Sequence, residues 1–231
     1  MGTLETERAP WRAIEAIAVF VLSFIVAVVV LLGVALFVKD KDLLTVIGIG
    51  AQELALLIGV LVWVRVRYQA GPDALGLRAL TASNVGRGAL IGIGGIAASI
   101  VVGAIVTSIV QAFSNHPVTR PDQIPLDHPA HAATLAIIGV SVILLAPLAE
   151  ETFFRGMVYR GLRRWASIWP AVILSAAIFA VSHILPLVML PIFVLGIGLA
   201  WAAERWGSIV PGIVAHMVFN TFGFFIIVFN R

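Results

Sequence analysis

Long hydrophobic runs alternate with short polar segments along most of the chain. The runs cover residues 14–38, 43–64, 88–110, 132–149, 168–203 and 208–229. A helix needs about 20 apolar residues to cross the ~30 Å hydrocarbon layer of a membrane, and each run reaches or approaches that length. The run 168–203 contains Pro186 and Pro191, which remove helical hydrogen-bond donors, so we expect two spans that turn near these prolines. The pattern predicts an all-α, polytopic transmembrane helical bundle of about seven spans, within a range of about six to eight.

Composition agrees with a membrane protein and excludes several other classes. The 231 residues are 61% hydrophobic and 12% charged, whereas soluble domains are about 45–50% apolar and about 25% charged. The chain has no cysteine, which excludes disulfides, zinc–thiolate sites and thiol nucleophiles. The net charge of +3 comes from clusters between the hydrophobic runs, so we expect no nucleic-acid partner.

Basic residues indicate how the bundle is oriented. Most of the 15 Lys and Arg residues lie in the N-terminal segment, in 65–87, in 155–164 and at Arg205. Cytoplasmic loops carry such an excess, so we expect these segments on the cytoplasmic side. We divide the chain into a cytoplasmic N-terminus (1–13), N-terminal transmembrane helices and loops (14–131) and a second set of transmembrane helices (132–231) that carries most of the candidate chemistry. In the N-terminal part, Gly88 and Gly92 are spaced for close helix packing.

Several polar residues interrupt the hydrophobic runs. A charged side chain at bilayer depth costs at least ~2.5–3.5 kcal/mol and is retained mainly where it is paired or used. The residues that stand out are Glu53, Glu150, Glu151, His183, His216 and Asn220.

The two adjacent glutamates have different surroundings in the predicted helix. Glu151 and Arg155 are four residues apart in the order that favours an ion pair, so we expect Glu151 to support the structure. Glu150 lies about 100° around the helix and lacks that partner. A desolvated carboxylate without a counter-charge is suited to act as a general base. Pro147 removes a backbone donor nearby, which we expect to leave the carbonyl of Ile143 unpaired.

Counting along the helices places four polar residues at similar depths. At ~1.5 Å per residue from the cytoplasmic helix ends, Glu150 lies about 21 Å deep, His183 about 25 Å, His216 about 16 Å and Asn220 about 22 Å. Phe179 and His183 share one helix face, as do His216 and Asn220. Any single buried His or Asn is commonly interhelical hydrogen-bonding glue, but a carboxylate, two imidazoles and an amide at matched depth are better explained as a catalytic site.

Glu53 has a different interpretation. Gln52 is its neighbour, and no basic residue lies in its own span. We expect it to act in structural hydrogen bonding or as a gate rather than in chemistry.

With these motifs the chain resembles the CPBP (Abi) intramembrane proteases, which include type II CAAX prenyl endopeptidases and bacteriocin-processing proteins. The resemblance covers roughly the C-terminal third, and the three motifs are specific together although each is weak alone. The motifs are Glu150-Glu151-Thr-Phe-Phe-Arg155, Phe179-Ala-Val-Ser-His183 and His216-Met-Val-Phe-Asn220.

The resemblance implies an intramembrane endopeptidase that hydrolyses a peptide bond of a membrane-associated substrate, in a prokaryotic cell membrane. Glu150 and His183 would activate a water molecule, and His216 and Asn220 would stabilise the oxyanion. Glu151, Arg155 and Phe179 would support the site. The substrate would be a peptide or protein at the bilayer.

A metal and two other functions remain open from the sequence. Glu150, His183 and His216 have the composition of a catalytic His₂Glu zinc site, but no His-Glu-x-x-His segment is present, so no cofactor is favoured. The few hydrogen-bond acceptors available to the imidazoles also favour a metal-free reaction. The alternatives are a non-catalytic immunity or scaffold protein that binds peptide, and a proton-coupled transporter that uses Glu53 and Glu150.

Overall fold

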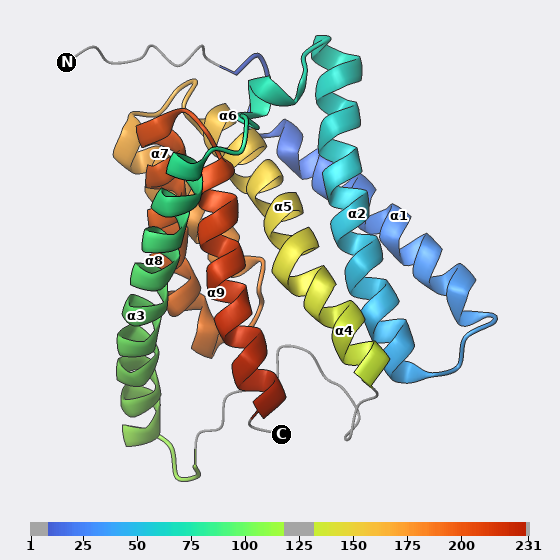
Figure 1. Ribbon diagram of the computed structural model, residues 1–231, viewed down its shortest axis with the longest axis vertical. Coiled ribbons are helices and arrows are strands. Elements are labelled where there is room, and N and C mark those ends of the chain that lie inside the picture. The colour runs from blue at the N-terminus through green and yellow to red at the C-terminus, as the bar shows by residue number, and fades with distance from the viewer. Residues whose placement is uncertain (1–8, 118–131, 230–231) are drawn as a thin grey trace.

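The computed structural model describes residues 9–117 and 132–229, and this part of the chain is a bundle of helices without strands (Figure 1). The predicted fold class is therefore confirmed. The first three helices are α1 (Glu15–Ala35), α2 (Lys41–Tyr68) and α3 (Ala82–Ala112), with a short 3₁₀ turn, Pro72–Leu75, between α2 and α3. The last three are α7 (Ile168–Val181), α8 (Pro186–Trp206) and α9 (Val210–Phe229).

A continuous helical segment, Ala132–Leu162, connects these two groups. It consists of α4 (Ala132–Val140), α5 (Ala146–Glu151) and α6 (Arg160–Leu162), joined by the π-helical segments η2 (Ser141–Leu145) and η3 (Thr152–Tyr159). Single π turns inside α-helices occur frequently at functional sites. Here they flank both glutamates of the first motif.

Five helices of the described chain are long and apolar enough to cross a membrane, and two more apolar helices are shorter. The long ones are Glu15–Ala35, Lys41–Tyr68, Ala82–Ala112, Ala132–Leu162 and Pro186–Trp206, and the shorter ones are Ile168–Val181 and Val210–Ile226. Together they agree with the predicted range of spans. Figure 1 shows α1 beginning at one end of the bundle and α9 ending at the other.

The turn inside the hydrophobic run 168–203 comes earlier than expected. Helix α7 ends at Val181, and α8 begins at Pro186, so Pro191 lies inside α8 rather than in the turn. Proline is tolerated in the first turn of a helix, where its missing N–H has no intrahelical acceptor, so Pro186 starts a helix instead of breaking one. Within the turn, Ile184 has a φ of 60°, an unusual value for a β-branched residue.

Helix α3 packs against α9 through its glycines. A Cβ on Gly88 would lie 2.6 Å from the Pro211 carbonyl oxygen, and one on Gly92 would lie 2.7 Å from the Ala215 carbonyl oxygen. Any larger residue would push the helices apart, so the predicted close packing is confirmed. This packing holds α9, which carries the third motif, in the interior of the bundle.

Candidate active site

A buried ion pair between Glu151 and Arg155 supports the candidate site. The Arg155 Nη1 atom lies 2.7 Å from Glu151 Oε1, and both side chains are fully buried. Arg155 also donates from Nη2 to the Gly196 carbonyl oxygen at 3.1 Å, and its Cζ lies 4.3 Å from the Phe179 ring centroid. The structure thus contains the pair that the i,i+4 spacing predicts, and it links α5 and η3 to α7 and α8.

His216 connects the two glutamates. Its Nδ1 lies 3.3 Å from Glu151 Oε1, and its Nε2 lies 3.9 Å from Glu150 Oε2. If Nδ1 of the neutral imidazole donates its proton to Glu151, then Nε2 carries no proton and can accept a hydrogen bond. The acid of a catalytic triad orients its histidine in the same way. The Nε2–Oε2 separation is too long for a direct hydrogen bond and suits a shared water molecule.

This contact corrects one expectation from the sequence. Glu151 Oε1 serves both Arg155 and His216, so Arg155 does not occupy this carboxylate alone. The imidazole of His216 therefore has an orienting acceptor, and the expected shortage of acceptors is wrong. The i,i+4 rule could not reveal it, because Glu151 and His216 are brought together by the packing of two different helices.

Gly212 is a site residue that the sequence analysis missed. It lies one turn before His216 on α9, and a Cβ at this position would lie 3.0 Å from Glu151 Oε2. Glycine therefore allows α9 to approach the buried carboxylate closely. The spacing of four residues between Gly212 and His216 is the only trace of this contact in the sequence.

Phe179 brings the two histidines into one cluster. Its ring centroid lies 5.0 Å from that of His183 and 5.6 Å from that of His216, both in edge-on geometry. The His183 Nδ1 atom lies 3.0 Å from the Phe179 carbonyl oxygen and 3.5 Å from Ser182 Oγ. Among the described residues, no hydrogen bond or ion pair joins His183 to Glu150, whereas His216 lies within ion-pair distance of that carboxylate.

Asn220 contacts the backbone of η2. Its Nδ2 donates to the Val142 carbonyl oxygen at 2.9 Å. In this π turn the Ala146 N–H donates to Ser141, five residues back. The corresponding donor for Val142 would be Pro147, which has no N–H. The π turn thus leaves the Val142 carbonyl, one residue before the expected Ile143, without a backbone donor, and the Asn220 amide satisfies it.

Glu53 lies closer to the chemistry than its position in an N-terminal span indicated. Its carboxylate on α2 and that of Glu150 on α5 interact electrostatically. Each has a buried Oε2 atom without a hydrogen-bond partner in the described part of the molecule. The expected structural hydrogen bonding at this oxygen is therefore not found, and the two carboxylates repel each other when both are ionised.

The candidate zinc ligands do not converge in this arrangement. Within residues 9–117 and 132–229, no group of three or more His, Cys, Asp or Glu side chains is placed to hold a metal ion. Glu150 and His216 face each other, while His183 turns its Nδ1 to backbone and hydroxyl oxygens. The residues as placed do not fit a His₂Glu zinc site, and we derive no step through a metal.

One segment of the chain matches a known protein family. Residues 132–222 match the family model described as Type II CAAX prenyl endopeptidase Rce1-like. This segment is similar to that family. It begins at the first residue of α4 and extends past Asn220, so it contains all three motifs, and the resemblance to CAAX proteases is confirmed. The match supports protease activity toward a peptide or protein at the membrane. No curated protein and no solved structure matches the chain.

Proposed function

We propose that the protein is an intramembrane endopeptidase that hydrolyses a peptide bond of a membrane-associated substrate. The observation that carries the proposal is the continuous set of contacts from Arg155 through Glu151 and His216 to Glu150. A buried, oriented imidazole that faces a second carboxylate is an arrangement for activating water. The Rce1-like match over the same helices supports the same reaction class.

In the proposed reaction, a water molecule sits between Glu150 Oε2 and His216 Nε2. Glu150 removes a proton from this water as its oxygen attacks the peptide carbonyl, and the proton then passes to the leaving amine. Glu151, held by Arg155, fixes the tautomer of His216. The resemblance pairs Glu150 with His183 for this step, but the 3.9 Å approach favours His216.

His183 and Asn220 have the remaining roles in the proposal. An amide nitrogen has two N–H donors, and Val142 accepts only one of those of Asn220. The second N–H can therefore stabilise the oxyanion that forms on the peptide carbonyl. His183, which also contacts the Phe179 ring edge-on, would accept a hydrogen bond from substrate through its Nε2, since its Nδ1 faces the Phe179 carbonyl and therefore carries the proton of the neutral imidazole.

The test of this proposal is the variant Glu150→Gln in reconstituted protein, assayed against a library of membrane peptides. Loss of a general base typically lowers the rate by about 10²–10⁴, and the amide keeps the size of the side chain. Glu204→Gln is the matched control, because Glu204 pairs with Arg163 near the end of α8 and outside the site. Hydrolysis by Glu150→Gln at the rate of this control would refute the assignment.

We also propose the orientation of the protein in a prokaryotic cell membrane. The end of the bundle where α2, α6 and α8 finish carries the basic residues of their last turns and following loops. By the positive-inside rule this end faces the cytoplasm, which places the start of α1 there as well (Figure 1). Cysteine substitutions at Arg205 and Lys39, labelled from one side at a time, test this orientation.

One observation favours a second function. Paired carboxylates inside a membrane are typical of proton pathways, and Glu53 and Glu150 form such a pair. The alternative is therefore a proton-coupled transporter. Proton uptake by vesicles that depends on Glu53, without hydrolysis of any peptide, would support it.

A further inference from the structure

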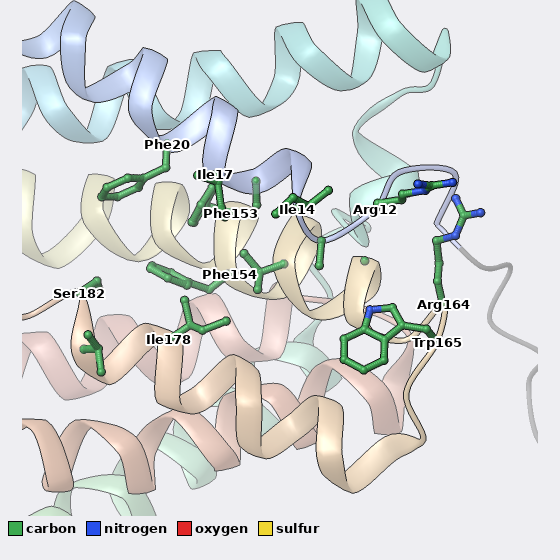
Figure 2. A pocket seen from close by; sticks show the side chains of 15 residues that line it. Arg12, Ile14, Ile17, Phe20, Phe153, Phe154, Arg164, Trp165, Ile178 and Ser182 are labelled. Atoms are coloured by element: carbon green, nitrogen blue, oxygen red, sulfur yellow. The ribbon is translucent and has the colours of Figure 1, made fainter.

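A groove of about 760 Å³ opens between α1, the segment from η3 to α6, and α7. Its volume falls in the range of small-molecule sites, about 300–1,000 Å³. The walls are apolar and come from Ile17, Phe20, Phe153, Phe154, Ile178 and Val181. Figure 2 shows Arg12, Arg164 and Trp165 gathered at one end, and Phe20 and Ser182 toward the other.

The two arginines give this groove a positive mouth. Both are exposed, and the described lining contains no Asp or Glu. Arg164 donates from Nη1 to the Pro10 carbonyl oxygen, which fixes its position at the mouth. Among the described residues, the Arg12 guanidinium has no hydrogen bond or ion pair. The nearby Glu15 carboxylate accepts from the Arg12 backbone N–H at 2.9 Å and from the Tyr68 hydroxyl of α2 at 2.6 Å. The guanidinium charges of Arg12 and Arg164 are therefore available to bind an anionic ligand.

The position of the mouth indicates the depth of the groove in the bilayer. Arg12 precedes the first residue of α1, and Arg164 follows the last residue of α6, so both lie where helices leave the membrane. Trp165 is 71% exposed beside them, as expected for an aromatic residue at the headgroup level. The apolar walls extend from there toward the bilayer interior, and Ile17 and Val181 are 59% and 62% exposed.

We propose that this groove binds an anionic phospholipid, with its phosphate between Arg12 and Arg164 and one acyl chain along the apolar walls. The charge of the mouth selects the headgroup, because a zwitterionic lipid would bring a cation near two guanidinium groups. The inner end of the chain would contact Ser182, whose Oγ lies 3.5 Å from His183 Nδ1. The inference concerns binding and does not depend on the proposed protease activity.

The experiment compares two lipids that share their acyl chains. Purified protein in detergent is titrated with phosphatidylglycerol and with phosphatidylcholine, and bound lipid is counted by native mass spectrometry. Each arginine near an anionic headgroup contributes about a fivefold preference, so wild type should prefer phosphatidylglycerol by about 30-fold. The double variant Arg12→Gln/Arg164→Gln should reduce this preference to near unity, whereas the matched control Arg205→Gln should retain it.

A second variant tests the apolar walls separately from the charge. Ile17→Trp fills the groove from an exposed position and should weaken binding of both lipids while the two arginines remain. Equal binding of the two lipids by wild type, retained preference in the double variant, or unchanged binding in Ile17→Trp would each overturn the proposal. So would displacement of phosphatidylglycerol by an isoprenylated peptide that excess phosphatidylglycerol cannot reverse, since the groove would then belong to substrate.

Discussion

The hydrogen bond from Asn220 to Val142 predicts a specific rescue of stability. Asn220→Ala removes the donor at 2.9 Å and leaves the Val142 carbonyl without a partner, because Ala146 pairs with Ser141 and Pro147 has no N–H. Pro147→Ala restores a backbone N–H at the position that a π turn needs. In that background, Asn220→Ala should therefore cost much less.

The size of the effect follows from the cost of an unpaired buried carbonyl. Such a group costs about 1–3 kcal/mol, so Asn220→Ala should lower the free energy of unfolding by about that amount. In the Pro147→Ala background the new N–H satisfies Val142, and most of this cost should disappear. The coupling energy between the two substitutions should then be about 1–3 kcal/mol, well above the ~0.3–0.5 kcal/mol scatter of independent sites.

The assay is unfolding in mixed detergent micelles, followed by helicity, with peptide turnover measured on the same four proteins. If the second N–H of Asn220 also stabilises the oxyanion, Asn220→Ala should lower kcat by about 10²–10³. Pro147→Ala should not restore that loss, because its N–H lies in the backbone of η2. Additive stabilities in the double variant would refute the capping of Val142, and full recovery of kcat would show that Asn220 acts through structure alone.

The remaining predictions concern the buried charges and metal content. Glu151→Gln should lower the free energy of unfolding, measured in the same micelles, by about 3–5 kcal/mol, because its pair with Arg155 is fully buried. A stable but inactive variant would assign Glu151 to the chemistry. Glu53→Gln should raise the melting temperature in detergent, because it removes repulsion with Glu150 and adds an amide donor; a lower melting temperature would contradict this reasoning. Purified protein should contain far less than one equivalent of zinc and keep its activity after exhaustive chelation, whereas loss that zinc alone restores would overturn this expectation.

Properties that depend on neighbouring residues could be predicted from the sequence. The hydrophobic runs determined an all-helical membrane bundle, because backbone groups in lipid must be paired within the helix. The order and spacing of Glu151 and Arg155 determined their ion pair, since residues four apart share a helix face. The motifs likewise located the Rce1-like segment, which the family match bears out.

Contacts between helices distant in sequence were decided only by the tertiary structure. The packing of α9 against α5 placed His216 on Glu151, and the packing of α2 brought Glu53 toward Glu150. Helical periodicity fixes which face of its helix a residue occupies but not which other helix that face contacts. Counting residues could therefore predict similar depths in the membrane, but not which side chains are in contact. The π turn before Pro147 left the Val142 carbonyl to be paired by Asn220 of a distant helix, because a local change of helical pitch depends on the bundle that surrounds it.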